Sequence, residues 1–409
     1  MQNWKRNFWI IWIGQAISQF TSATLQFAIV WYLTDRTGSA LVLSAAMLAG
    51  FLPRGLLGPV IGVYIDRYSR KAIMIISDLV IAGACLLLSI AGLFGQLPIG
   101  LIMAVLLVRS LGDSFHSPCM QAVTPQIVPQ DQLVRCAGYS QSLQSVSQIA
   151  SPAAAAVLYN SWSLNGVIFL DVLGALLAVA ALCIAKIPPT PAKTQECAPH
   201  VWKEALEGFQ ILRANRGVMG LVLVSAVYAL ALAPTSALFP LMSMGYFGGT
   251  SFHASVAEVS FSIGLLLGSL FLSWWGGGKD KVQVIIFSFL LMGLSLICSG
   301  LLPQNGFLLF VVCSCLMGVS GPFYWGMYTP LMQQSFAQEY MGRVMALSGS
   351  IMVVASPVGL SLSGVFAEYY GVERWFFLAG LMTLAAALIC MLHPDIRRCD
   401  TTGGNERKF

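Results

Sequence analysis

The stretch Gly62-Val-Tyr-Ile-Asp66-Arg67-Tyr-Ser69-Arg70-Lys71 places one acidic and three basic side chains on a short loop between two long apolar segments. Each flanking segment has the length of about 20 residues that a helix needs to cross a bilayer. Charged loops of this kind often only anchor helices at the cytoplasmic surface. A short charged loop can also clamp two helices together in one of two states, and the stretch alone leaves both interpretations open.

The composition is that of an all-α integral membrane protein. Of the 409 residues, 57% are hydrophobic and only 10% are charged, whereas soluble domains carry about 25% charged residues. The mean hydropathy is +0.77. The apolar runs are much longer than the strands of an outer-membrane barrel, so membrane helices are expected. The apolar run after the basic residues 1–6 is too long for a signal peptide, and we interpret it as the first membrane helix.

Lysine and arginine concentrate on alternate loops, which predicts that both termini are cytoplasmic and that the number of spans is even. Arg36 and Arg374 fall on the opposite side, and Arg54 and Arg109 lie inside helices. This distribution accounts for the net charge of +5 by membrane topology, and we expect no nucleic-acid partner.

The ten cysteines are scattered, mostly within apolar segments, and no Cys-x-x-Cys pair occurs. Neither a disulfide framework nor a metal site is therefore expected. We also expect no cofactor.

Twelve spans can be identified in the sequence. They cover approximately residues 8–33, 41–64, 72–94, 98–118, 138–159, 166–186, 218–242, 255–275, 282–302, 306–328, 345–366 and 374–393. The predicted domains are an N-terminal six-helix bundle (1–187), a cytoplasmic linker with an amphipathic helix (188–216), a C-terminal six-helix bundle (217–393) and a cytoplasmic tail (394–409). We expect the polar tail to be disordered.

The two halves repeat each other in sequence. Thr124-Pro125 recurs as Thr329-Pro330, and Ala150-Ser151-Pro152 recurs at the same offset as Ala355-Ser356-Pro357. Such internal similarity predicts two parallel six-helix repeats around an axis normal to the membrane. The second copy of the charged loop, Gly276-Gly-Gly278-Lys279-Asp280-Lys281, is degenerate, so a gate built from the two copies would be asymmetric.

The charged loop resembles the signature of the major facilitator superfamily, Gly-x-x-x-Asp-Arg-x-Gly-Arg-Lys, between its second and third helices. Serine replaces the second glycine of that pattern. The residues that we assign to this gating motif are Gly62, Asp66, Arg67, Arg70, Lys71 and, as a possible partner within the third helix, Asp78.

The whole chain also resembles the macrolide efflux proteins among the drug–proton antiporters of this superfamily. The stretches that carry the resemblance are Trp12-Ile-Gly14-Gln15-Ala16, Thr37-Gly-Ser-Ala40, Gly50-Phe-Leu-Pro53, Cys136-Ala-Gly-Tyr-Ser-Gln-Ser-Leu-Gln-Ser145, Asp171-Val-Leu-Gly174, Ala237-Leu-Phe-Pro240, Ser299-Gly-Leu-Leu-Pro-Gln304 and Gly342-Arg343-Val344. The resemblance implies proton-coupled export of erythromycin-like macrolides across the bacterial cytoplasmic membrane by alternating access, and hence antibiotic resistance. It further implies a small-molecule drug, protons and the lipid bilayer as partners, and a monomer.

Helix 4 carries two opposite charges in the interior of an apolar segment, Arg109 and Asp113. A charge at the bilayer centre costs about 2.5–3.5 kcal/mol on insertion scales. Residues four apart share one helix face, so the pair can partly neutralise itself. Protonation of Asp113 would then uncover Arg109, although a static structural ion pair is an equal alternative. Arg54, in a helix kinked by Pro53, can extend into an aqueous cavity or pair with Asp113.

Four further acids lie nearer the ends of the predicted spans: Asp35, Asp78, Asp171 and Glu258. For each, a solvated helix end is the simpler interpretation, and Asp78 could alternatively pair with the charged loop. Helices 1 and 8 line the cavity of facilitators, so the resemblance makes Asp35 and Glu258 candidates for an outward-facing proton site.

Glutamine stripes on helices 1 and 5 are expected to face protein or water, because desolvated amides facing lipid are costly. Helix 10 offers aromatic side chains that would suit a bulky amphiphile, or that simply pack. The predicted substrate-cavity residues are Gln15, Gln19, Gln26, Gln141, Gln144, Gln148, Tyr228, Tyr324, Trp325 and Tyr328.

A further pattern in helix 5 resembles the antiporter motif Gly-x-x-x-Gly-Pro-x-x-Gly-Gly with serine or alanine at every glycine position. Small side chains there allow a neighbouring helix to approach closely, and ordinary packing is the alternative. The residues are Ser147, Ser151, Pro152, Ala155 and Ala156.

An enzyme is not expected, because the sequence lacks His-Glu-x-x-His, Gly-x-Ser-x-Gly and a Walker loop. The alternative function that stays open is proton-coupled export of another amphiphile, such as tetracycline or a siderophore.

Overall fold

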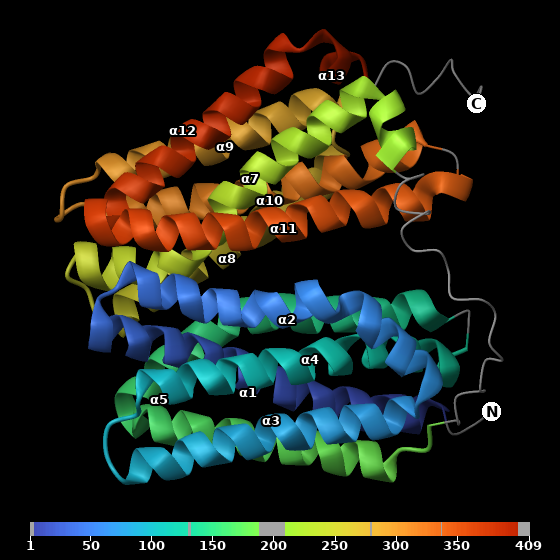
Figure 1. Cartoon of the computed structure of the whole chain (residues 1–409), viewed down its shortest axis with the longest axis vertical. Coiled ribbons are helices and arrows are strands. Elements are labelled where there is room, and N and C mark those ends of the chain that lie inside the picture. The colour runs from blue at the N-terminus through green and yellow to red at the C-terminus, as the bar shows by residue number, and fades with distance from the viewer. Residues whose placement is uncertain (1–3, 130–131, 188–208, 279, 337, 400–409) are drawn as a thin grey trace. The chain divides into compact units, whose positions relative to one another are not determined.

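The computed structural model describes residues 4–129, 132–187, 209–278, 280–336 and 338–399, and over these residues it is helical without β-strands (Figure 1). The chain divides into two compact units. Unit 1 comprises residues 1–38 and 45–196, and unit 2 comprises residues 39–44 and 197–409.

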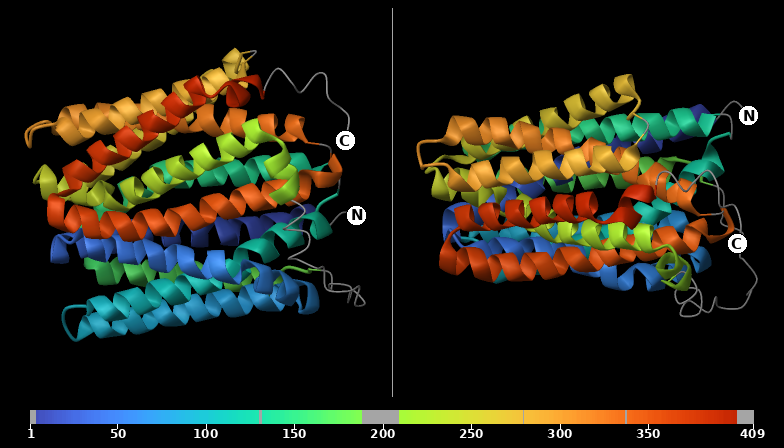
Figure 2. Two further views of the ribbon diagram at one scale, coloured as in Figure 1. Left: turned by 45° about the horizontal axis from the view of Figure 1, so that its top comes forward. Right: turned by 90° about the horizontal axis from the view of Figure 1, so that it is seen from above.

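The helices of the N-terminal half are long and lie side by side (Figures 1 and 2). They are α1 (Trp4–Thr37), α2 (Ala40–Arg67), α3 (Arg70–Leu93), α4 (Ile99–Ile127) and α5 (Leu133–Ile184). Within unit 1, α5 packs on α1 and α3, and α3 packs on α4.

Unit 2 contains the remaining elements. They are α7 (Arg216–Pro240), the π-helical turn η2 (Leu241–Tyr246), α8 (Ser251–Trp275), α9 (Lys281–Leu301), α10 (Phe307–Ser335), α11 (Gln338–Tyr370), α12 (Val372–Leu392) and α13 (Pro394–Arg398). Helix α10 packs between α8 and α9, and α12 packs on α9 and α7.

Within the described residues, nine helices are long and apolar enough to cross a membrane. The prediction of a membrane protein built of long helices is therefore confirmed, whereas the count of twelve spans stays a prediction. Helix α1 has 34 residues but is not among the nine, and its glutamine, serine and threonine side chains lower its hydropathy.

The predicted spans 138–159 and 166–186 fall in one continuous helical element, α5. A straight helix of its 52 residues would extend about 78 Å, more than twice a hydrocarbon core of about 30 Å. Both ends of α5 lie on the right-hand side of Figure 1, so the element turns back on itself. The chain stays locally helical through residues 160–165, which contain neither proline nor glycine. The membrane-length stretch Leu164–Ile184 that follows agrees with the predicted span 166–186.

Apolar side chains from all five long helices meet in the core of unit 1. Ile11, Ile61, Met74, Val123 and Leu182, from α1 to α5 in order, belong to one buried cluster. This core fixes the rotation of each helix about its axis, and it thereby decides which polar side chains point inward.

The beginning of the predicted disordered tail is ordered in the structure. Helix α13 packs on α7, with Ile396 and Cys399 buried. Gly217 of α7 permits this contact, because a Cβ atom there would overlap Asp395 and Cys399. The prediction of disorder is therefore wrong for residues 394–399, while residues 400–409 and most of the predicted amphipathic linker helix lie outside the described residues.

Candidate functional site

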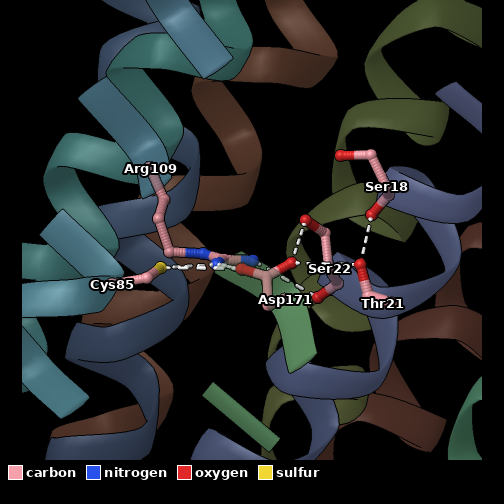
Figure 3. Close-up of polar contacts among 6 residues, drawn as sticks. All are labelled: Ser18, Thr21, Ser22, Cys85, Arg109 and Asp171. Carbon is pink, nitrogen blue, oxygen red and sulfur yellow. Dashed lines mark hydrogen bonds and ion pairs between the residues drawn. The ribbon is translucent and has the colours of Figure 1, made fainter. Parts of the chain in front are cut away.

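A buried ion pair lies in the interior of unit 1. Arg109 of α4 contacts the Oδ2 atom of Asp171 in α5 through Nη1 (Figure 3), and their side chains are 11% and 1% exposed. In an apolar interior each charge stabilises the other. Because both groups are removed from water, losing either one would leave the other buried without a counter-charge.

Further polar atoms complete this cluster. Ser22 Oγ donates to Asp171 Oδ1 at 2.7 Å, and Thr21 Oγ1 lies 3.4 Å from the same oxygen. Arg109 Nη1 donates to Cys85 Sγ at 3.0 Å, and Nη2 donates to the backbone oxygen of Ser22 at 3.3 Å. Helices α1, α3, α4 and α5 therefore all contribute to one set of hydrogen bonds, which we call the Arg109 cluster.

The structure corrects two expectations about these charges. The ion-pair partner of Arg109 is Asp171, whereas the sequence suggested Asp113, which is exposed one turn further along α4. The sequence favours a solvated helix end for Asp171, but this side chain is fully buried. The reason is the close approach of α5 to α1: a Cβ atom at Gly174 would overlap the side chain of Thr21, so only glycine lets α5 bring Asp171 against α1.

A second buried polar group lies on the same helices. Asp78 of α3 accepts a hydrogen bond from Gln15 Nε2 at 3.4 Å, and its Oδ1 atom lies 3.5 Å from His116 Nε2. The side chains of Asp78 and His116 are 7% and 13% exposed. Asp78 is therefore not a solvated helix end. His116 is a functional candidate that the sequence patterns miss, although its position seven residues after Arg109 places it on the same face of α4.

Two basic residues of the gating motif, Arg70 and Lys71, bind near the ends of two helices. Arg70 Nη1 donates to the backbone oxygen of Ala122 at 3.1 Å, near the end of α4. Lys71 Nζ donates to the backbone oxygens of Cys183 and Ala185 at 3.1 and 2.9 Å, at the end of α5. A cation suits the position of Lys71, because the last carbonyl groups of a helix lack partners within it, and the negative end of the helix dipole favours both cations.

Ser69, which departs from the family pattern, is the N-cap of α3 and accepts a hydrogen bond from the backbone N–H of Ala72. The side chains of Arg54, Asp66 and Arg67 lie outside the described part of the structure, as does the environment of Gly62. Their predicted roles stay predictions.

The other two candidate acids are separated by unit. Asp35, exposed near the end of α1, accepts a hydrogen bond from Tyr159 at 3.1 Å in unit 1. Glu258 of α8 lies in a cavity of unit 2. The two therefore do not form one cluster within either unit, and their roles in proton coupling stay predictions.

The polar stripes differ in their exposure. Gln15 binds Asp78, Gln26 is partly buried, and Gln19, Gln144 and Gln148 are exposed. The side chain of Gln141 lies outside the described residues. The small residues of the antiporter-type pattern, Ser147, Ser151, Pro152, Ala155 and Ala156, are buried, as close helix packing requires.

The aromatic candidates of unit 2 pack mainly on one another. The ring of Tyr324 lies 4.9 Å from Tyr228 and 5.4 Å from Tyr328, and all three tyrosines are buried. Trp325 is 51% exposed. Burial of the tyrosines favours the packing interpretation, and a role in binding substrate stays a prediction for all four.

Comparisons with known proteins agree with this architecture. The family described as Major Facilitator Superfamily matches residues 11–250 and 223–406. The chain is 49% identical over 398 residues to macrolide efflux protein A of Streptococcus pyogenes, covering 97% of this chain and 98% of that protein. It is 50% identical over 323 residues to a protein of the same name from Enterococcus faecalis, covering 79% of this chain and 100% of that one.

Among solved structures, a mutant of the nucleoside transporter NupG superimposes with a TM-score of 0.76 over 94% of this chain and 99% of its own. Its sequence identity is 13%, so it supports the fold alone. The two matched segments cover nearly the whole chain, and the expected family is confirmed. The chain belongs to the Major Facilitator Superfamily, as an efflux transporter with macrolide efflux protein A among its relatives.

Proposed function

We propose that this protein exports macrolide antibiotics from the bacterial cytoplasm in exchange for protons, by alternating access, and thereby confers resistance. The observation that carries the proposal is the 49% identity to macrolide efflux protein A, which extends over 97% of the chain. The proposal includes cytoplasmic termini, as the distribution of lysine and arginine predicts, and a monomeric transporter.

The Arg109 cluster supports the proton-coupled part of the proposal. Ionisable residues within a membrane domain are costly and commonly mark proton pathways. A proton on Asp171 would remove the counter-charge of Arg109 and weaken the contacts that join α4 and α5. Asp113, one turn along α4, remains the alternative carrier, because a proton there would change the charge balance around the same arginine.

Energetics constrain the exchange. A membrane potential of about 100 mV is worth roughly 2.3 kcal/mol per charge, and one pH unit adds about 1.4 kcal/mol. One entering proton therefore supports roughly a 500-fold gradient of a neutral drug. If a drug with one positive charge leaves as one proton enters, the voltage contribution cancels and only about a 10-fold gradient remains. A second coupled proton would restore the larger gradient.

The test is erythromycin counterflow in proteoliposomes under an imposed pH gradient, with wild type beside Asp113→Asn and Asp171→Asn. We expect the gradient to drive accumulation by wild type, and the variant that lacks the proton carrier only to equilibrate the drug. If both variants still concentrate erythromycin, neither carboxylate couples protons, and Asp35 and Glu258 become the next candidates. If wild type does not transport erythromycin, the macrolide assignment is wrong and the family assignment is unaffected.

A further inference from the structure

The carboxylate of Asp78 (α3) is enclosed by polar side chains from two other helices of unit 1. Gln15 Nε2 (α1) donates to its Oδ2 atom at 3.4 Å, and His116 Nε2 (α4) lies 3.5 Å from its Oδ1 atom. The side chains of Asp78 and His116 are 7% and 13% exposed, and no described residue other than Asp78 gives His116 Nε2 a polar partner. The imidazole ring and the carboxylate therefore face each other away from water.

The net charge of this pair depends on whether His116 carries an extra proton. With a neutral imidazole, Asp78 is a buried carboxylate whose hydrogen-bond partner Gln15 is uncharged, and such a group is costly in an apolar interior. With one added proton, His116 is an imidazolium ion that donates through Nε2, and the two groups become an ion pair without net charge. Burial therefore favours the uptake of one proton by the pair, and histidine is the side chain that ordinarily changes its charge near neutral pH.

The nearest charges on neighbouring helices do not replace His116 as the partner of Asp78. Among the described residues, Asp113 (α4) and Asp171 (α5) act electrostatically on Asp78, and both are acids. Asp171 is already paired with Arg109, so the charge of this arginine is matched elsewhere.

The helices around the pair carry further ionisable residues: Arg54, Tyr64, Asp66 and Arg67 on α2, Arg70, Lys71 and Cys85 on α3, and Cys119 on α4. The four side chains of α2 lie outside the described part of the structure. Arg70 and Lys71 donate to backbone oxygens near the ends of α4 and α5, and α1 has no charged residue between Arg6 and Asp35. Within the described residues, His116 is therefore the basic group in contact with Asp78.

In the proposed topology the pair lies on the cytoplasmic side of the Arg109 cluster. His116 comes seven residues after Arg109, which is about 10.5 Å along α4. Asp78 comes eight residues after Arg70, where α3 begins, which is about 12 Å along that helix. The loop before α3 is basic and is expected in the cytoplasm. A proton that moves from the Arg109 cluster to the cytoplasm would therefore pass the level of this pair.

We propose that Asp78 and His116 form a second proton-binding site of the exporter, which takes up one proton on the imidazole ring of His116 in each transport cycle and releases it to the cytoplasm. The proton adds to the ring nitrogen that carries none, and no other bond changes. The inference rests on the proposed function for the exchange of drug against protons. It supplies the second coupled proton that a drug with one positive charge needs for more than about a 10-fold gradient.

The first test measures the number of protons exchanged per erythromycin in proteoliposomes without a membrane potential, after subtraction of the flux into protein-free liposomes. At a pH difference of one unit, net flux reverses at about a 10-fold drug gradient for one proton and about 100-fold for two. We expect reversal near 100-fold for wild type and near 10-fold for His116→Gln. The matched control is His393→Gln, which replaces an exposed histidine of unit 2 and should behave as wild type.

The second test needs no drug. Solid-state NMR of the full-length protein with ¹⁵N-labelled histidine, in lipid, distinguishes a charged from a neutral imidazole ring, and the His116 signal is identified by its absence in His116→Gln. We expect Asp78→Asn to lower the charged fraction of His116 at pH 6.5 at least threefold, because the counter-ion is lost. His393 in the same spectrum should not change.

A further variant keeps the inference testable if His116→Gln does not fold. His116→Lys retains a positive charge beside Asp78 that is not released near neutral pH, so its flux should also reverse near 10-fold. Two-proton exchange by these variants, one-proton exchange by wild type, or a charge on His116 that does not depend on Asp78 would overturn the inference. If wild type does not transport erythromycin while the charge on His116 depends on Asp78, the proton-binding site stands and the macrolide proposal fails.

Discussion

The Arg109–Asp171 pair predicts an asymmetry between two single substitutions that neutralise it. Arg109→Gln leaves a buried carboxylate, whereas Asp171→Asn leaves a buried guanidinium group. A carboxylate can become neutral by taking a proton, but an arginine cannot lose one under ordinary conditions. The two variants should therefore differ both in stability and in its dependence on pH.

The magnitude follows from the burial of both groups, whose side chains are 11% and 1% exposed. Breaking a buried ion pair by removing one partner costs about 3–5 kcal/mol. For Arg109→Gln this cost has an upper bound, because an aspartate of ordinary acidity takes up a proton at pH 7 for about 4 kcal/mol and at pH 5 for about 1.5 kcal/mol. Asp171→Asn has no such bound, so acid should rescue Arg109→Gln and not Asp171→Asn.

The assay is thermal unfolding of the purified variants in detergent at pH 7 and pH 5, followed by loss of the main folded peak in size-exclusion chromatography. Asp35→Asn serves as the control, because it neutralises an exposed acid in the same unit. We expect the unfolding temperature of Arg109→Gln to approach that of wild type at pH 5, while Asp171→Asn stays lower at both values. Wild-type stability of Asp171→Asn, or equal effects of pH on the two variants, would refute the reasoning.

Two further substitutions test the packing and the helix ends. Gly318→Ala should destabilise the protein by about 1–3 kcal/mol, because its Cβ atom would overlap the backbone oxygen of Phe261 in α8. Its control is Gly349→Ala, whose Cβ atom would meet no atom within 4 Å. This control should be neutral or stabilising in the same thermal assay. Lys71→Met removes two charge-assisted hydrogen bonds to the end of α5 and should cost about 1–3 kcal/mol, whereas the exposed Lys186→Met should change the unfolding temperature little.

The fold could be predicted from the sequence because its signals are long and repeated. Apolar segments of bilayer length, basic residues on alternate loops and two similar halves all indicate the same architecture. The ends of individual helices were harder to predict from the sequence. The sequence predicts two spans within α5, and the element does reverse direction between them, yet residues 160–165 contain neither proline nor glycine and stay locally helical. The order of the first tail residues depends on Gly217, whose missing side chain makes room for α13.

The candidate site was predicted only in part, and the partner of Arg109 shows why. Spacing places Asp113 within reach of Arg109 on an isolated helix, where residues four apart have Cβ atoms about 5–6 Å apart. The spacing does not show whether Arg109 or Asp113 faces the core. That choice depends on the rotation of α4 and α5 about their axes as Gly174 packs on α1. The position of Asp171 within an apolar segment was a second signal. Asp171 lies five residues inside the predicted span 166–186, about 7.5 Å from its start, and a carboxylate at that depth requires a partner. Arg54 and Arg109 both lie deep inside other spans of the same half, so either could be that partner. Depth therefore indicates that Asp171 needs a basic partner, and only the ion pair in the structure identifies that partner as Arg109.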